Sequence, residues 1–501
     1  MGRAAAIPVL EFRIADLNAE YRGASMASLM DNAGKAVARE VRRRVKGAHP
    51  RAVVFCGQGN NGGDGYVAAR ELAGHFHVTV VFAEGREAVD AAGISGGALK
   101  HLEADRSVRK IDWSPSRRTA VERACRGAAV VLDGLLGSGI SGPARAPYPE
   151  LIALINRVGA LKVAIDVPSG FPFAPAVRPD LTVTIEAPKV GMTRANSGRI
   201  VPVRIGFPPE AWTHTGPGDL LLVPRVDDFA EKADRGILAV VAGGPYSGAP
   251  ALVALAAHAA GIGLVHVFTP ERVADVVRRF DPTLVVHGLP GGEVEASHVE
   301  GLLAEISKRR CAALAVGPGL GRARGTQDAV RLLLQGLRVP AVVDADAIAA
   351  ATLVPEGTLS RAILTPHARE FRLLSKQPAG DSRDVKTRKA AARAAAAAHR
   401  TALLLKGHVS VITDGRRMKL NDAGVSAMAV GGAGDVLTGL IGAMLAKGLS
   451  PFDAGRVGAF VSGRAGEIAF ETLGHSLKPT DMIDAVPRVF AGHLPWWGGK
   501  P

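Results

Sequence analysis

The chain has 501 residues, of which 47% are hydrophobic and 22% charged, so it is long enough for two domains and apolar enough to fill their cores. These proportions exclude an intrinsically disordered chain. A net charge of +14 would suit nucleic-acid binding, but the arginines are scattered and no run of five basic residues occurs, so we expect anionic small molecules and no nucleic-acid partner.

Cysteine content and hydropathy indicate whether the protein is cytoplasmic, secreted or bound to a membrane. Cys56, Cys125 and Cys311 lie far apart and lack metal-type spacing, which is typical of reduced thiols. The first residues contain no secretory-type apolar segment, so a cytoplasmic protein is expected. Residues 236–270 contain no Asp, Glu, Lys or Arg, yet their glycines and prolines favour a strand, a buried helix and a second strand over a membrane span. We therefore expect no association with membranes.

In the first half of the chain, short runs rich in Val, Ala and Ile alternate with helical patterns. This alternation predicts a parallel sheet with helices on both faces. The pattern breaks over residues 204–224, which are rich in proline and glycine, and a domain boundary is placed near Leu222. The predicted strands are residues 52–57, 77–83, 129–135, 162–167 and 181–187.

A second alternation begins at Gly236 and ends in two long helices, residues 434–448 and 454–474. The fold class is therefore α/β, with two three-layer α/β/α domains over residues 1–222 and 223–501. The strands predicted for the second domain are residues 237–243, 264–269, 283–288, 312–318, 341–346, 362–366, 401–407 and 410–415.

The first glycine-rich stretch, GQGNNGGDGYVAAREL, begins at Gly57 directly after a predicted strand and continues into a helix. Ligands of open α/β sheets bind at this position, and backbone N–H groups at the start of a helix bind phosphate. Asn60 and Asn61 add amide oxygens that suit a hard cation. The alternative is a simple turn capped by Asp64. The spacing matches neither the dinucleotide fingerprint nor a Walker loop.

Four further stretches occur with it in order: LMDNAG (29–34), LDGLLGSGISGP (132–143), AIDVPSG (164–170) and EAPKVGM (186–192). Together they resemble the NAD(P)H-hydrate epimerase family, which has a Rossmann-like fold. The resemblance implies that Asn61, Asp133 and Ser169 bind potassium and that Asp166 with Lys189 forms the acid–base pair. The implied substrate-binding residues are Asn60, Asn61, Gly62, Gly63, Asp64, Gly137, Ser138, Gly139, Ile140, Ser141, Gly142, Pro143 and Asp166.

The chain departs from this family at two places. The stretch after Gly170, FPFAPAVRP, is shorter than usual, and Ile185-Glu186 stands where the family usually has Phe-Gly. Both changes concern the local contacts to substrate.

The second glycine-rich stretch, GGAGDVLTG (431–439), begins a long apolar helix whose N–H groups could form an anion hole. Asp435 could either cap this helix or take a proton from a substrate hydroxyl. Before it come VGPGLGRARGTQDAV (316–330), VVDADAI (342–348), ILTPHAREFRLL (363–374) and LLLKGHVSVITDG (403–415). Together these stretches resemble the NAD(P)H-hydrate dehydratase branch of the ribokinase-like fold.

This second resemblance implies that Asp435 is the general base when a nucleotide phosphorylates the hydroxyl of the hydrated ring. His367 could instead only cap a helix, and Ala433 stands where the family usually has Thr or Ser. The implied residues around the hydrated nicotinamide nucleotide are Ala249, Gly319, His367 and Asp435. Those around the adenine nucleotide are Lys406, Gly407, His408, Val409, Ser410 and Gly434.

Both resemblances together imply a bifunctional isomerase and lyase of metabolite repair. It would interconvert the R and S hydrates of NADH and NADPH and dehydrate the S hydrate with ADP, giving AMP and phosphate. Potassium in the first domain, Mg²⁺ with ADP and a homo-oligomer are expected. One alternative is a ribokinase-like kinase of a small vitamin precursor, with a nucleotide-binding regulatory first domain. Another is a first domain that only senses nucleotides or acts as a scaffold.

Overall fold

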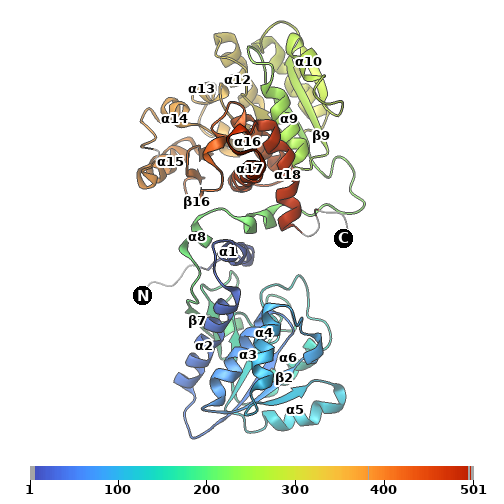
Figure 1. Cartoon of the computed structure of the whole chain (residues 1–501), viewed down its shortest axis with the longest axis vertical. Helices are drawn as coiled ribbons and strands as arrows, with labels where there is room; N and C mark the ends of the chain where they lie inside the picture. The colour runs from blue at the N-terminus through green and yellow to red at the C-terminus, as the bar shows by residue number, and fades with distance from the viewer. Residues whose placement is uncertain (1–5, 382, 495–496, 498–501) are drawn as a thin grey trace. The chain divides into compact units, whose positions relative to one another are not determined.

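The computed structural model describes residues 6–381, 383–494 and 497, which form two compact units, Met1–Pro209 and Glu210–Pro501 (Figure 1). The structure divides the chain between Pro209 and Glu210, whereas the sequence predicts a boundary near Leu222. The residues after Pro209 pack within the second unit: Leu220 and Val223 join its core, and Asp219 forms an ion pair with Arg456. Asp219 and Arg456 are both almost completely buried, so loss of either partner would leave a buried charge without its counter-charge.

The first unit is built on a seven-stranded, fully parallel sheet of order β3-β2-β1-β4-β5-β6-β7. Its strands are β1 (Arg51–Cys56), β2 (His77–Phe82), β3 (Arg109–Asp112), β4 (Val130–Gly134), β5 (Leu161–Ile165), β6 (Leu181–Ile185) and β7 (Arg199–Val203). The five strands predicted for this half are confirmed. β3 and β7 were not predicted, because each is short and carries charged or proline residues among its few apolar ones.

Helices cover both faces of this sheet. Helices α2, α3 and α4 pack side by side on one face, and the other face buries Leu151, Ile152 and Ile155 of α6 with Val121 of α5 (Figure 1). Val53 and Phe55 of β1 lie in the same core as α5 and α6. The helices are α1 (Val9–Tyr21), α2 (Met26–Arg44), α3 (Asn60–Ala73), α4 (Ile94–Ala104), α5 (Arg118–Cys125), α6 (Tyr148–Arg157) and α7 (Arg194–Ser197).

The second unit is built on a nine-stranded sheet of order β10-β9-β8-β11-β12-β13-β14-β15-β16. All eight predicted strands are confirmed, and β16 is additional. The pairs β14–β15 and β15–β16 are antiparallel, because the turns that join them are too short for a crossover. The strands are β8 (Ile237–Val241), β9 (Leu264–Pro270), β10 (Val285–Leu289), β11 (Ala313–Val316), β12 (Ala341–Val343), β13 (Ala362–Leu364), β14 (Ala402–Leu405), β15 (Ser410–Thr413) and β16 (Met418–Asn421).

Two separate cores lie on the two faces of this sheet. One face packs against α9 (Ala249–Ala259), α16 (Ala433–Ala446), α17 (Pro451–Leu473) and α18 (Pro479–His493). The other packs against α11 (Val299–Lys308), α12 (Arg324–Gly336), α13 (Ala347–Ala351), α14 (Ala368–Ser375) and α15 (Val385–His399). The remaining α-helices are α8 (Pro209–Thr213) and α10 (Glu271–Val277). This is the three-layer arrangement that the sequence predicts.

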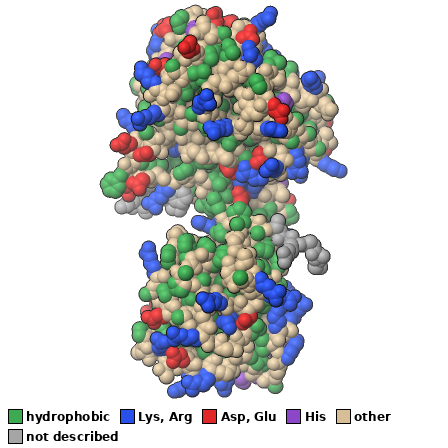
Figure 2. Space-filling model, turned by 180° about the vertical axis from the view of Figure 1, so that it is seen from behind, with side chains coloured by type: hydrophobic (Ala, Val, Ile, Leu, Met, Phe, Trp, Pro, Cys, Tyr) green, Lys and Arg blue, Asp and Glu red, His purple; other side chains and the backbone are tan. Residues whose placement is uncertain are grey.

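The uncharged segment 236–270 forms β8, α9 and β9, as predicted. Among the helices of the described residues, none is long and apolar enough to cross a membrane. On the face drawn in Figure 2, the Lys and Arg side chains are scattered over both units and do not gather in one patch.

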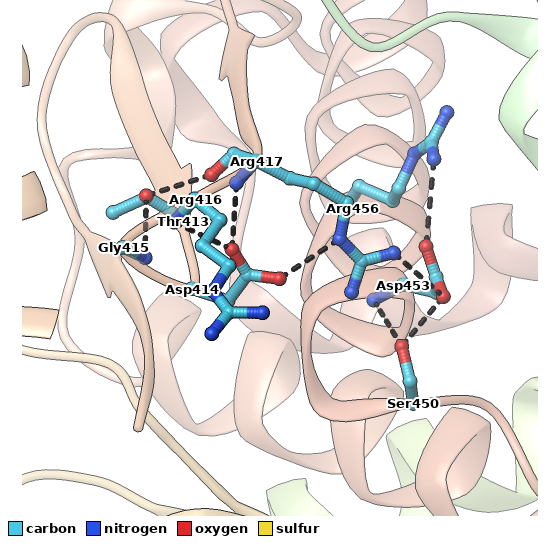
Figure 3. Close-up of polar contacts among 8 residues, drawn as sticks. All are labelled: Thr413, Asp414, Gly415, Arg416, Arg417, Ser450, Asp453 and Arg456. Carbon is cyan, nitrogen blue, oxygen red and sulfur yellow. Dashed lines mark hydrogen bonds and ion pairs between the residues drawn. The ribbon is translucent and has the colours of Figure 1, made fainter. Parts of the chain in front are cut away.

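A polar network fixes the start of α17 to the β15–β16 hairpin (Figure 3). Ser450 caps the helix by accepting a hydrogen bond from the N–H of Asp453 at 3.3 Å. The carboxylate of Asp453 also faces Arg456, at 3.4 Å, and Arg417 of the hairpin turn, at 3.7 Å. Arg417 in turn pairs with Asp414 at 2.8 Å, so the network joins two distant parts of the chain.

Candidate functional site

A cavity of about 490 Å³ opens at the carboxyl edge of the first sheet. In doubly wound sheets this edge is where ligands bind. Eight of the predicted substrate-binding residues line it: Asn60, Asn61, Asp64, Gly137, Ser138, Gly139, Ile140 and Asp166. Ser141, Gly142 and Pro143 follow in the same loop but are not part of the lining. The shortened stretch 171–179 also contributes nothing to the described lining, so this departure from the family lies away from the cavity wall.

Gly62 and Gly63 do not line the cavity, and their place in the structure is explained by packing. A Cβ atom on Gly62 would lie 1.9 Å from the carbonyl oxygen of Gly57. One on Gly63 would lie 2.6 Å from Sδ of Met30. The glycines therefore let α3 start against its own loop and against α2.

Asn61, Asp133 and Ser169 come together around the backbone of Leu136. The Asn61 Nδ2 donates to the Leu136 carbonyl at 3.1 Å, and the Leu136 N–H donates to Ser169 Oγ at 2.8 Å. The Ser169 N–H donates to Asp133 Oδ2 at 2.8 Å, and its hydroxyl donates to Oδ1 of the same carboxylate. Burial raises the pKa of Asp133 to about 6, although these hydrogen bonds oppose the shift.

The remaining oxygen of Asn61 is unusual. Its Oδ1 is buried and has no hydrogen-bond partner among the described residues. A buried acceptor without a partner is costly. Asn61 is linked through Leu136 and Ser169 to the buried carboxylate of Asp133. An amide oxygen, a carboxylate and a hydroxyl form a set of hard oxygen donors, so the residues present fit a potassium ion.

Asp166 and Lys189 form an ion pair from which water is almost completely excluded. The side chain of Lys189 is 0% exposed and that of Asp166 is 7% exposed. Lys189 Nζ also donates to the Ile185 carbonyl at 2.9 Å and lies 4.0 Å from the ring centre of Phe12. Asp166 Oδ1 also accepts hydrogen bonds from the Ile185 N–H at 3.0 Å and from the Thr184 hydroxyl at 3.4 Å. The pair lies at the ends of β5 and β6, with Asp166 on the cavity wall.

Glu186 occupies a similar position after the next strand. Both Asp166 and Glu186 adopt positive φ, 62° and 59°, a conformation that glycine adopts at the lowest cost. The Glu186 carboxylate accepts the Ile205 N–H at 2.8 Å and lies 3.4 Å from Arg204. Glu186 therefore fixes the chain that follows β7. It is not among the residues that line the cavity.

Helix α1 supplies one part of the cavity wall that no sequence motif marks. Phe12, Arg13 and Asp16 line the cavity with Asp64 and Asp166. Burial, with the charges of Glu20 and Asp166, raises the pKa of Asp16 to about 6. Burial and the charges of Asp166 and Asp16 raise the pKa of Asp64 well above its usual value. The amphipathic pattern of residues 9–21 gives only a weak signal, so no motif marked this helix.

In the second unit, two of the predicted nucleotide-binding residues, Lys406 and Gly434, lie next to each other at the start of α16. A Cβ atom on Gly434 would lie 3.4 Å from Lys406 Nζ, so the lysine and the glycine-rich start of the helix are adjacent. Lys406 Nζ lies 2.6 Å from Asp344 Oδ1, and Thr438 donates to Asp344 Oδ2 at 2.7 Å. Burial works against the charge of Asp344, but Lys406 and the hydrogen bonds keep its pKa below the usual value.

Asp435 is the first acidic residue of α16. Its burial, helped by the charge of Asp344 nearby, raises its pKa to about 7. A carboxylate with a pKa close to neutral is well suited to take up a proton at physiological pH. Asp344 lies in the stretch VVDADAI, and the structure places it between Lys406 and Thr438.

His367 caps α14, which was one of its two predicted roles. Its Nδ1 accepts hydrogen bonds from the N–H groups of Arg369 and Glu370, at 3.0 and 3.2 Å, so a neutral ring carries its proton on Nε2. The Glu370 carboxylate accepts a hydrogen bond from the His367 N–H at 2.9 Å. The side chain is 48% exposed, which leaves the ring accessible to a ligand.

The remaining predicted residues lie at the start of α9, in the loop after β11 and between β14 and β15. Gly319 has a φ of 68°, and a Cβ atom on it would lie 3.1 Å from that of Ala249, so these two predicted neighbours do meet. The turn from β14 to β15 consists of Lys406, Gly407, His408 and Val409, and Ser410 is the first residue of β15. Buried Arg388 of α15 holds this turn by donating to the Lys406 carbonyl at 2.9 Å.

Two family profiles match the chain. The NAD(P)H-hydrate dehydratase family matches residues 238–488, and the YjeF-related protein N-terminus family matches residues 26–191. A solved ribokinase-like superfamily protein from Enterococcus faecalis is 21% identical and covers 56% of this chain and 96% of its own, with a TM-score of 0.50. This likeness shows the ribokinase-like fold of the second unit.

Two similar full-length relatives are both called bifunctional NAD(P)H-hydrate repair enzyme Nnr. The one from Pyrobaculum aerophilum is 40% identical and covers 96% of this chain and 97% of its own length. The one from Methanothermobacter thermautotrophicus is 36% identical, with 96% and 94% covered. Because the similarity spans both units, the alternative of a small-molecule kinase with a regulatory first domain is not favoured. The chain belongs to the family of bifunctional NAD(P)H-hydrate repair enzymes.

Proposed function

We propose that the first unit interconverts the R and S hydrates of a reduced nicotinamide nucleotide. The observation that carries this proposal is the buried Asp166–Lys189 pair at the wall of the first cavity. The two hydrates differ in the side of the ring that carries the hydroxyl. An acid protonates the hydroxyl as its C–O bond breaks and the ring nitrogen supplies the electron pair. A base then takes a proton from the water that adds to the opposite side.

Potassium is proposed to bind Asn61, Asp133 and Ser169. The unpartnered Asn61 Oδ1 supports this, because a cation would complete its coordination. The ion would offset the charge of the Asp133 carboxylate, which forms no ion pair with the described residues. It would also link Asn61 at the start of α3 to the segments that follow β4 and β5.

The second unit is proposed to dehydrate the S hydrate at the expense of ADP. Asp435 takes the proton of the ring hydroxyl as that oxygen attacks the terminal phosphorus of ADP, and AMP leaves. The N–H groups at the start of α16 and Lys406 stabilise the charge on the transferred group. Phosphate then leaves the ring carbon and a neighbouring C–H bond loses its proton, which restores the double bond.

Mg²⁺ is proposed to arrive with ADP. It usually binds through substrate phosphates and one or two carboxylates, and Asp344 and Asp435 lie at this site. Among the described residues, no group of three His, Cys, Asp or Glu side chains forms a separate metal cage. Ala249, Gly319 and His367 are proposed to contact the hydrate, and the Lys406–Ser410 turn with Gly434 the adenine nucleotide. A homo-oligomer remains a prediction that sedimentation can test.

One assay tests both activities together. The full chain receives the R hydrate alone with ADP, and dihydronicotinamide absorbance, AMP and phosphate are followed. Equal amounts of the three products support both activities, because R must first become S. A stable phosphorylated product would contradict the dehydratase. R hydrate that is consumed no faster than without enzyme, while S hydrate supplied in a parallel reaction is consumed, would contradict the epimerase.

A further inference from the structure

The end of β2 places an acidic side chain on the wall of the first cavity. Glu84 follows β2 by two residues and lines the cavity with Gln58 and Tyr148. The Tyr148 hydroxyl donates to Glu84 Oε2 at 2.7 Å, and Gln58 Nε2 lies 3.5 Å from Oε1. These contacts hold the carboxylate beside the first glycine-rich loop. Neither Glu84 nor Tyr148 has a role in the functions proposed above.

The position of Glu84 on the sheet matches one end of a dinucleotide. Strands β1 and β4 lie between β2 and β5, so Glu84 and Asp166 are three strand spacings apart, roughly 14 Å. If the hydrated ring lies at Asp166 and the pyrophosphate at the loop after β1, the adenosine ribose lies at the end of β2. At this point an acidic side chain accepts a hydrogen bond from the ribose 2′-hydroxyl.

Among the described residues that line the cavity, none at this end carries a positive charge that could receive a 2′-phosphate. Arg86 is close in sequence, but its Nε and Nη2 donate to the two oxygens of Asp112 at 3.1 and 2.9 Å. It is not part of the cavity lining. Among the described lining residues, Arg13 is the one cation, and it lies on α1 with Asp16, on the wall shared with Asp166. A phosphate on the ribose would therefore meet the charge of Glu84 without a compensating partner.

We propose that Glu84 makes the first unit selective for the hydrates of NADH over those of NADPH. This proposal rests on the proposed epimerase function and adds the substrate that this site prefers. The 2′-hydroxyl donates to the Glu84 carboxylate, and a 2′-phosphate is repelled by it. Because Glu84 is exposed to solvent, the repulsion is screened by salt.

The test measures kcat/KM for epimerisation of the NADH and NADPH hydrates by the full chain and by two variants. E84Q removes the charge and keeps the shape, and E87Q removes an exposed charge of the same loop as a matched control. We expect the wild-type enzyme and E87Q to prefer the NADH hydrate by about tenfold or more. E84Q should reduce this ratio to about threefold or less, mainly through a lower KM for the NADPH hydrate.

Ionic strength gives a second readout. At a fixed potassium concentration, added choline chloride should reduce the wild-type preference and leave that of E84Q nearly unchanged. Equal kcat/KM for the two hydrates in the wild-type enzyme, or an unchanged ratio in E84Q, would overturn the selectivity and leave the epimerase function standing. Epimerisation of neither hydrate would overturn the epimerase function itself, so the two failures are distinguishable.

Discussion

Lys406 Nζ lies 2.6 Å from one carboxylate oxygen of Asp344, and Thr438 donates to the other at 2.7 Å. The carboxylate therefore joins three parts of the second unit: the end of β12, the turn after β14 and the second turn of α16. Asp344 is 1% exposed, so water does not replace these contacts. Lys406 is in this way directed toward the start of α16, where the transferred phosphoryl group is proposed to bind.

The D344N variant tests this arrangement. An amide of the same shape removes the charge that holds Lys406, so dehydration should slow by about 100-fold, because a displaced catalytic group costs about that much. Epimerisation by the same protein should be unchanged. The matched control is D328N, an exposed carboxylate of α12 whose side chain is 50% exposed. Full dehydratase activity in D344N would show that Asp344 does not position Lys406.

The pH dependence of dehydration tests Asp435 as the base. Since its pKa is raised to about 7, the fraction of ionised Asp435 falls as the pH drops through 7. We therefore expect kcat/KM for dehydration to decline below about pH 7, by tenfold for each pH unit well below the pKa. Epimerisation of the same samples is the control. A profile that is flat down to about pH 5 would contradict the assignment of Asp435.

The cation site predicts a specific ion dependence. Replacing potassium with choline should slow epimerisation by about tenfold or more, because the oxygens of Asn61 and Asp133 lose the cation that they are proposed to bind. N61L should be slow in both salts, because it lacks the ligating oxygen. Dehydration of the S hydrate by N61L is the control for folding. Epimerisation that is equally fast in both salts would contradict the proposal that potassium binds at this site.

The acidic residues of the first cavity predict a pH-dependent stability. The folded-state pKa of Asp16 is raised to about 6, so the protonated form is favoured by folding. Its contribution to stability is complete below the unfolded pKa of about 4 and is lost as the pH rises through about 6. Hydrogen-exchange protection of peptides from α1, β1, β4 and β5, after correction for the intrinsic effect of pH on exchange, should therefore be higher at pH 5 than at pH 8. D16N should reduce this difference between the two pH values. An unchanged difference would contradict the contribution of Asp16 to the pH dependence of stability.

The sequence predicted most of both sheets because their central strands are buried runs of Val, Ala, Ile and Leu, such as β1, β4 and β8. It did not predict β3, RKID, or β16, MKLN, because a four-residue strand with charged residues has no clear periodicity. Their pairing depends on neighbours that are distant in sequence.

The sites were predicted where a motif carries the chemistry. The first loop, Asp166 and Lys189 do meet, as do Lys406 and Gly434. Asp16 and Glu84 were not predicted, because each is an ordinary acidic residue until the fold brings it to the cavity wall. Glycines 62 and 63 share a motif with the ligand-facing residues, and only the packing against Gly57 and Met30 separates their roles.

The most direct test of two separate sites on one chain is complementation between D166N and D435N. Each full-length variant receives the R hydrate of NADH with ADP, alone and mixed with the other variant, and both epimers and NADH are followed. D435N should form the S hydrate without NADH, and D166N should leave the R hydrate unconsumed beyond the rate without enzyme. The mixture should restore NADH formation. Loss of both activities in either variant, or no recovery in the mixture, would contradict the two-site account.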